Sequence, residues 1–270
     1  MSAMEVGTRS LPACLRELAA HWELLLSWVS RELKVRYKQS ALGAAWAVLQ
    51  PLSATVIFVV IFSRFAKIPT AGVPGPLFYY SALLPWTFFS SSLAFAVPSL
   101  INNMTLVTKT YFPREILPLA GVLASLVDFA VALVTFAALM IVYRAPLTAN
   151  ILYAPLIIAV EILLTSAVVL YASALNVFFR DIRFVVPLVT QIWMYATPVI
   201  YPLAVVPERF RLLYMLNPLA GLVESYRNVT VMGQPPDPRY FGLASLLSVL
   251  AFVVAYRYFK RVEMSFADVI

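Results

Sequence analysis

Several stretches of this chain are long, apolar and free of charge, which a water-soluble fold does not accommodate. Residues 42–63 and 184–206 contain no Asp, Glu, Lys or Arg. The hydrocarbon core of a bilayer is about 30 Å thick and needs roughly 20 mostly apolar residues per helix. Charged residues are 12% of the chain, against about 25% in soluble domains. The sequence therefore predicts a polytopic helical membrane protein and excludes a soluble globular enzyme.

We predict an all-α fold with six transmembrane helices in a single transmembrane domain, residues 1–270. The predicted spans are residues 42–63, 77–101, 116–142, 154–178, 184–204 and 240–258. With the N-terminus inside, thirteen of the twenty Lys and Arg residues fall on the inner side and seven on the outer side. Basic residues concentrate on the cytoplasmic side of membrane proteins. Both termini are therefore expected in the cytoplasm.

An amphipathic helix is predicted before the first span, over residues 14–37. Its apolar side chains recur at intervals of three and four, which places them on one face: Leu15, Leu18, Trp22, Leu25, Leu26, Val29 and Leu33. Such a helix lies in the membrane interface with its apolar face in lipid. Two interpretations stand: an anchor for the first span, or a surface on which another protein or an anionic lipid headgroup docks.

The connection before the last span, residues 207–236, contains two short apolar runs separated by Asn217 and Pro218. Neither run is long enough to cross a bilayer. Irregular backbone at membrane depth survives only where protein or a water-filled cavity satisfies its polar groups. We therefore predict re-entrant helices at the outer face, with an ordinary outer loop as the alternative.

Two acidic residues interrupt the predicted spans, Asp128 in the third and Glu161 in the fourth. Charges within a membrane are costly and usually face the bundle interior. Hydrogen bonding between helices or the lining of a cavity is the favoured role. A proton-coupled carrier built on both acids is the alternative from another functional class.

Aromatic residues crowd the second and fifth spans. Because aromatic faces stack on sugar rings, six of them are candidates for a glycan path, with core packing as the simpler account. They are Tyr79, Trp86, Phe89, Trp193, Tyr195 and Tyr201.

Motifs for catalysis and for nucleotide binding are missing from the sequence. It contains no G-x-x-x-x-G-K-[ST], H-E-x-x-H, C-x-x-C or G-x-S-x-G, so a P-loop ATPase, a zinc protease and a serine hydrolase are not expected. Cys14 and His21 alone are too few ligands for a metal site. We expect a transport subunit that is not an enzyme and holds no cofactor or metal of its own.

Four segments resemble the permease subunits of polysaccharide and teichoic-acid ABC exporters, an ABC-2 type membrane domain family. They are residues 31–52 (RELKVRYKQSALGAAWAVLQPL), 112–119 (FPREILPL), 175–183 with 191–202 (LNVFFRDIR and QIWMYATPVIYP), and 216–219 with 224–227 (LNPL and ESYR). Together with the length and the six spans, the likeness covers nearly the whole chain.

The resemblance implies a homodimer in the bacterial inner membrane that docks two copies of a separate ATPase, which binds ATP and Mg. It implies a cargo of polysaccharide on a polyprenyl pyrophosphate lipid, moved to the outer leaflet. O-antigen is the first expectation, with wall teichoic acid or capsule as alternatives. The loop after the second span would couple to the ATPase through Asn102, Asn103, Lys109, Tyr111, Arg114 and Glu115.

Four basic residues before the first span suit a pyrophosphate headgroup: Arg31, Lys34, Arg36 and Lys38. Arginine is well suited to bidentate contact with phosphate. The competing account is membrane topology together with attraction to anionic lipids, which contributes about 1 kcal/mol per basic residue.

Overall fold

The computed structural model describes residues 11–38, 40–110 and 112–266. Throughout these ranges the regular secondary structure is helical, with no strand, which confirms the all-α prediction. The longer helices are α2 (Leu11–Ala20), α3 (Trp22–Tyr37), α4 (Trp46–Phe58), α5 (Gly75–Ala96), α8 (Ile116–Val142), α9 (Ala154–Phe178), α10 (Ile182–Tyr195), α12 (Pro218–Arg227) and α13 (Pro238–Val262). The shorter ones are η1 (Gly43–Ala45), η2 (Val59–Phe65), α6 (Ser99–Asn102), α7 (Met104–Lys109), η3 (Ala149–Tyr153), η4 (Leu203–Val205), α11 (Glu208–Tyr214), η5 (Asn228–Met232) and η6 (Glu263–Ser265).

Four helical segments are long and apolar enough to cross a membrane: Gly43–Phe65, Ile116–Val142, Ala149–Phe178 and Pro238–Ser265. The other two predicted spans differ from these. The 22-residue helix α5 is long enough but less apolar, and most of its side chains are buried within the protein. Helix α10 has 14 residues, about 21 Å of helix, and the predicted span of residues 184–204 continues beyond it as irregular chain. The count of six spans stays a prediction.

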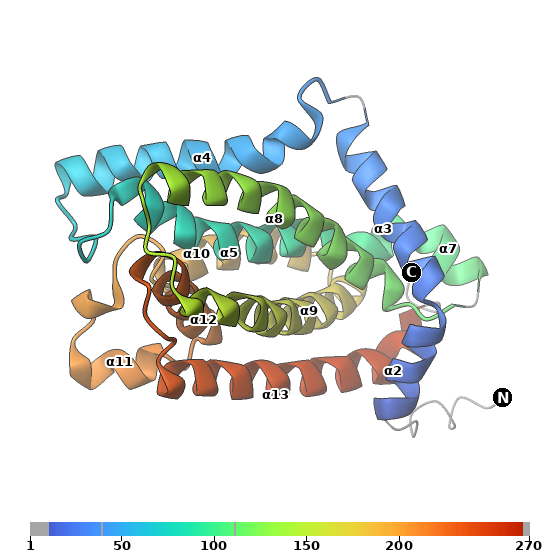
Figure 1. The fold of residues 1–270 in the computed structure, drawn as a ribbon. Helices are drawn as coiled ribbons and strands as arrows, with labels where there is room; N and C mark the ends of the chain where they lie inside the picture. Colours follow the sequence, from blue (N-terminus) through green and yellow to red (C-terminus); the bar gives the residue numbers. More distant parts are fainter. Residues whose placement is uncertain (1–10, 39, 111, 267–270) are drawn as a thin grey trace.

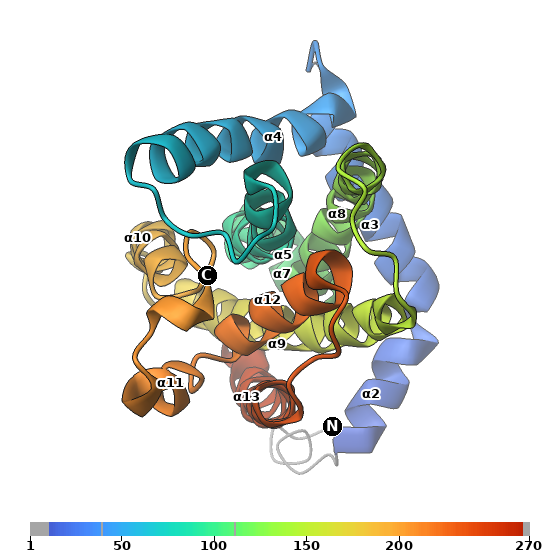
Figure 2. The same cartoon turned by 60° about the vertical axis from the view of Figure 1, so that its left-hand side comes forward.

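The long helices α4, α5, α8, α9 and α13 run side by side, and α2 and α3 cross the bundle at one end (Figure 1). Helix α5 packs against α8, α4, α9 and α12, while α13 packs along α9. Figure 2 shows α5 and α12 inside the ring formed by the other helices. Helix α5, which is rich in hydroxyl and aromatic side chains, is therefore surrounded mainly by other helices.

The amphipathic prediction corresponds to two helices, α2 and α3, which meet at His21. Leu25, Trp28 and Val29 of α3 pack against Ala120 and Ala124 of α8. Part of the apolar face therefore meets protein and not lipid. This packing fixes α3 against the bundle, so α3 is held by other helices as well as by the membrane interface.

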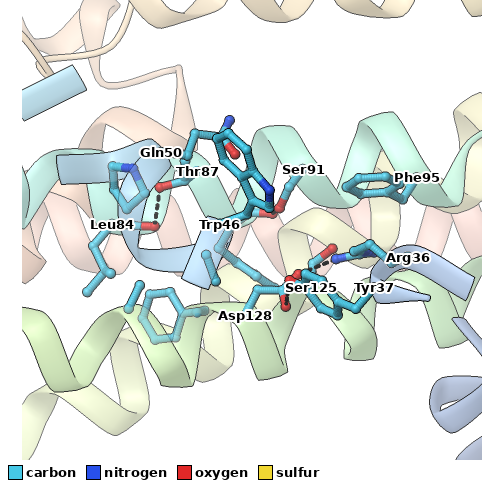
Figure 3. A pocket seen from close by; sticks show the side chains of 15 residues that line it. Arg36, Tyr37, Trp46, Gln50, Leu84, Thr87, Ser91, Phe95, Ser125 and Asp128 are labelled. Atoms are coloured by element: carbon cyan, nitrogen blue, oxygen red, sulfur yellow. Dashed lines mark hydrogen bonds and ion pairs between the residues drawn. The ribbon is translucent and has the colours of Figure 1, made fainter. Parts of the chain in front are cut away.

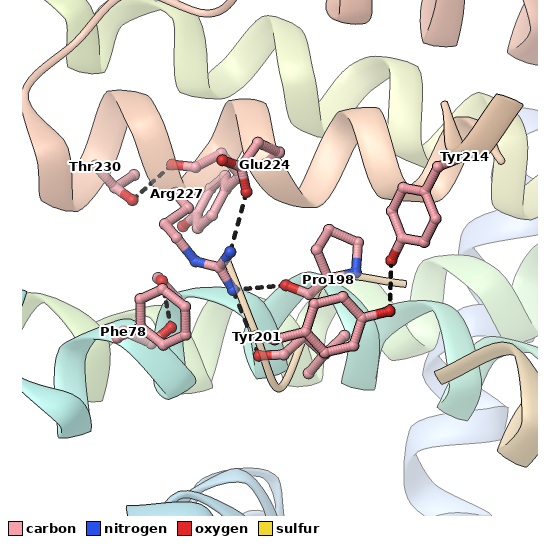
Figure 4. Close-up of polar contacts among 10 residues, drawn as sticks. Phe78, Pro198, Tyr201, Tyr214, Glu224, Arg227 and Thr230 are labelled. Atoms are coloured by element: carbon pink, nitrogen blue, oxygen red, sulfur yellow. Dashed lines mark hydrogen bonds and ion pairs between the residues drawn. The ribbon is translucent and has the colours of Figure 1, made fainter. Parts of the chain in front are cut away.

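The outer connection is held by a buried arginine (Figure 4). Arg227 of α12 is fully buried, forms an ion pair of 3.0 Å with Glu224, and donates a 2.7 Å hydrogen bond to the carbonyl of Pro198. Its guanidinium lies over the Phe78 ring of α5, at 4.0 Å from the centroid. Asn217 caps α12 by accepting from the amide of Leu219 at 3.2 Å. These bonds satisfy irregular backbone within the bundle; the re-entrant assignment stays a prediction.

Helices α5 and α8 approach closely at Gly121. A Cβ atom at this position would lie 2.7 Å from the Cβ and 2.9 Å from the Cα of Ala96, so the backbone of one helix would have to move. A Cβ atom added at Gly242 of α13 would have no neighbouring atom within 4 Å.

This difference makes a matched pair of substitutions. Gly121→Ala should destabilise the protein by about 1–3 kcal/mol because of overpacking. Gly242→Ala should leave it unchanged or stabilise it by up to about 1 kcal/mol, since alanine favours helix. Equilibrium unfolding in mixed micelles would measure both changes. Equal effects of the two substitutions would contradict the close approach of α5 and α8.

Candidate functional site

The four basic residues predicted to bind a headgroup do not act as one cluster. Arg31, Lys34 and Lys38 follow the i, i+3, i+7 pattern of one helical face, and they line an open groove on α3 with a volume of about 730 Å³. Arg36 points the other way, into the bundle. The groove therefore presents three positive charges, and the fourth serves another site.

Arg36 forms an ion pair with Asp128 of α8, 92 residues away in sequence. Tyr37 donates a 2.6 Å hydrogen bond to the other carboxylate oxygen of Asp128. Burial, together with this hydrogen bond, raises the pKa of the Tyr37 phenol to about 12, so the hydroxyl remains a donor near neutral pH. The guanidinium of Arg36 also lies 3.8 Å from the Phe95 ring centroid. The favoured role for Asp128, hydrogen bonding and cavity lining, agrees with this geometry.

These groups form the polar end of a partly open cavity of about 240 Å³ between α3, α4, α5 and α8. Figure 3 shows Trp46 and Gln50 of α4 and Thr87 and Ser91 of α5 around the same space. We call this space the inner cavity, and the groove lined by Arg31, Lys34 and Lys38 the basic groove. Tyr37 lines both of them, so the two sites adjoin.

The six aromatic candidates for a glycan path divide into two sets. Tyr79, Trp86 and Phe89 are buried in the core around α5. Phe89 contacts Trp193 edge to face at 5.2 Å, and Trp193 donates a 2.9 Å hydrogen bond to Asn217. Tyr195 is exposed, and Tyr201 donates to its carbonyl at 2.8 Å. Within one chain these residues pack and cap helices, and none of them lines the inner cavity.

Helix α7, in the segment of the candidate coupling residues, lies at the end of the bundle where α3 crosses it (Figure 1). Asn102 ends α6, Asn103 donates a 2.8 Å hydrogen bond to the carbonyl of Ser99, and Lys109 is exposed at the end of α7. Tyr111 lies outside the described residues.

Arg114 and Glu115 point inward, toward the last helix. Glu115 is fully buried; it pairs with Lys260 at 2.7 Å and accepts a 3.1 Å hydrogen bond from Tyr256. Arg114 donates to the backbone carbonyls of Val107 and Glu263. These two side chains therefore tie the α7 segment to α13.

Glu161 lies apart from these sites. It is buried in α9, and neither carboxyl oxygen has a hydrogen-bond partner among the described residues. It does not line the inner cavity, so the structure does not bring the two intramembrane acids together in one site.

The partner of Asp128 was missed because Arg36 was grouped with its neighbours in sequence. The signal was present in the periodicity, since Arg36 follows Val29 by seven residues and Leu33 by three, on the apolar face. A charge on a face that packs against apolar helices needs a counter-charge there. Gln50, Thr87 and Ser91 were also missed, because single polar residues within spans carry little pattern.

The ion pair makes a double-mutant test possible. Asp128→Asn keeps the hydrogen bond from Tyr37 but leaves Arg36 buried and unpaired, and should destabilise the protein by about 3–5 kcal/mol. Adding Arg36→Gln should recover much of that loss in equilibrium unfolding. The exposed Asp181→Asn, a control of the same chemistry, should change stability by no more than about 0.5 kcal/mol. A double variant as unstable as Asp128→Asn alone would contradict the pairing.

Comparison with known proteins finds similarity over most of the chain. Residues 23–231 match the family model described as ABC-2 type transporter. The chain is 30% identical over 257 residues to the O-antigen export system permease protein RfbA of Myxococcus xanthus, covering 94% of this chain and 98% of that protein. It is 30% identical over 250 residues to RfbA of Klebsiella pneumoniae, covering 92% and 95%.

A more distant relative is the polysialic acid transport protein KpsM of Escherichia coli. It is 22% identical over 231 residues, which cover 84% of this chain and 90% of that protein. The matched family region contains α3 except its first residue, together with the basic groove and the inner cavity. The chain therefore belongs to the ABC-2 type transporter family, as a multi-pass membrane protein.

Proposed function

We propose that this chain is the membrane-spanning subunit of an ATP-driven exporter of polysaccharide, with O-antigen linked to polyprenyl pyrophosphate as its cargo. The observation that carries the proposal is the similarity to two O-antigen export permeases over more than nine-tenths of the chain. The cargo would move from the cytoplasmic to the outer leaflet of the bacterial inner membrane. The more distant relative KpsM is named a polysialic acid transport protein, so capsule is an alternative cargo, as is wall teichoic acid.

The basic groove provides the electrostatics that a pyrophosphate needs. Lys34 and Lys38 are exposed and have no ion-pair partner among the described residues. Arg31 makes a 3.4 Å contact with Glu32 at the surface, and its guanidinium lies 4.4 Å from the centroid of the Trp28 ring. Exposed cations held on one helical face attract a polyanion from the membrane surface. The groove adjoins the bundle at Tyr37, where a lipid headgroup would approach the first span.

The proposal includes two copies of a separate ATPase, with ATP and Mg, and a second copy of this chain. The short helix α7 is a fitting contact for the ATPase because its exposed residues stand at the end of the bundle predicted to face the cytoplasm. Arg114 and Glu115 connect α7 to α13, so a motion of α7 imposed by the ATPase would be transmitted to α13. Both termini would lie on this cytoplasmic side.

A proton-coupled carrier is supported less well. A carrier acid must exchange its proton during transport, whereas Asp128 is bound to Arg36 and Tyr37. Glu161 lies in another part of the bundle. Normal export by Asp128→Asn would exclude the carrier mechanism.

Purification in mild detergent tests the proposal directly. A P-loop ATPase should co-purify at one copy per chain, and polyprenyl-linked glycan should be identified in the sample by mass spectrometry. Recovery of this chain alone, under conditions that keep other ABC complexes intact, would contradict it.

Charge removal in the basic groove tests the headgroup role. Replacing Arg31, Lys34 and Lys38 together with Gln should raise the half-saturating concentration of lipid-linked glycan for ATPase stimulation by at least about tenfold, because each basic residue contributes about 1 kcal/mol. Assembly, measured by size exclusion, should not change. Arg64, Lys67 and Arg209 replaced with Gln form the matched control, since these exposed residues lie away from the groove. Equal effects of both triple variants would assign the groove residues to topology alone.

A further inference from the structure

We infer that the inner cavity binds the sugar residue joined directly to the lipid's pyrophosphate, while the basic groove holds the pyrophosphate itself. This inference rests on the proposed function and adds a second recognition site to it. The two sites adjoin at Tyr37, which lines both. A ligand whose phosphate lies in the groove would therefore place its first sugar at the cavity.

The charges of the two sites favour this division. The basic groove carries three cations, whereas the inner cavity contains Arg36 and Asp128, whose charges cancel. A phosphate entering the cavity would therefore find no net positive charge there. A sugar hydroxyl is neutral and both donates and accepts hydrogen bonds, so it can donate to Asp128 and accept from Arg36.

Unpartnered polar groups mark where the ligand would bind. The Arg36 side chain is only 10% exposed. Its Nη2 atom is buried and has no hydrogen-bond partner among the described residues. Gln50 of α4 lines the same cavity with an exposed side chain, whose amide makes no hydrogen bond to any described residue. Gln50 lies seven residues into the segment Gly43–Phe65, about 10 Å along the helix. Polar groups at such depth are costly without a partner, so a hydroxyl-rich ligand supplies what the site lacks.

The remaining walls suit a sugar ring. Trp46 lines the cavity from α4 and is 52% exposed, so its indole face is available to stack on the C–H face of a ring. The hydroxyls of Thr87 and Ser91 line the α5 side and bond only to carbonyls of their own helix. Their oxygen lone pairs remain free to accept. The volume of about 240 Å³ is enough for one sugar ring, so we assign the site to the first sugar.

The test measures binding of defined lipids to the complete complex with its ATPase in nanodiscs. The probes are undecaprenyl pyrophosphate and the same lipid carrying one N-acetylglucosamine, one galactose or one mannose. The wild-type protein should bind at least one sugar-bearing probe about fivefold more tightly than the sugar-free lipid, the size expected of one or two net hydrogen bonds.

The variant Gln50→Ala/Ser91→Ala should reduce this preference to less than about twofold while leaving the Kd of the sugar-free lipid unchanged. The matched control is Ser53→Ala/Ser90→Ala on the same two helices. Ser90 bonds to the carbonyl of Thr87 at 3.3 Å, as Ser91 bonds to that of Phe88 at 3.3 Å, but neither control residue lines the cavity. This control should keep the full preference.

Three results would overturn the inference, and they are distinguishable. A wild-type protein without preference for any sugar-bearing probe excludes a sugar site. A Gln50→Ala/Ser91→Ala variant that keeps the preference, or a control that loses it equally, places the sugar elsewhere. If no probe binds the wild-type protein more tightly than phosphatidylglycerol does, the proposed function itself fails, and this inference fails with it.

Discussion

The ion pair between Arg36 and Asp128 is the interaction on which the arrangement of this end of the protein depends. Each charge lies on a surface that is otherwise apolar, and either one alone would cost several kcal/mol there. Together they allow only one relative position of α3 and α8, with Tyr37 completing the carboxylate's bonds. The fit of Val29 against Ala120 and Ala124 follows from that position.

The interior of the bundle is packed like the core of a soluble protein, with polar groups among its apolar side chains. Most side chains of helix α5 are buried, and some of its polar groups bond to a neighbouring helix: Tyr80 donates to the carbonyl of Ala132 of α8 at 3.1 Å. Gly121 allows α8 to approach it closely. At the far end of the bundle, Arg227 donates a hydrogen bond to the carbonyl of Pro198, which lies in a bend outside the helices. An enclosed helix of this bundle can carry polar side chains, whereas a helix that faces lipid needs an uninterrupted apolar surface.

This difference explains what the sequence could predict. The long apolar stretches predicted helices such as Ile116–Val142 and Ala154–Phe178, because lipid selects continuous hydrophobicity. Helix α10 could not be bounded, since the apolar run continues through the turn after Tyr195. Of the four basic residues predicted to bind a headgroup, three lie together in the basic groove and Arg36 does not; the headgroup role stays a prediction. The inner cavity could not be predicted, because Asp128, Gln50 and Ser91 come together only through the packing of α4, α5 and α8.

The buried bond between Glu115 and Lys260 links two helices that begin and end far apart in the chain. Glu115 stands at the start of α8 and Lys260 near the end of α13, and α13 packs along α9. A force applied at α7 would thus reach both α8 and the α9–α13 pair at the same moment. The helices of the bundle would then move together as one rigid body in response to the partner, and would not shift one after another.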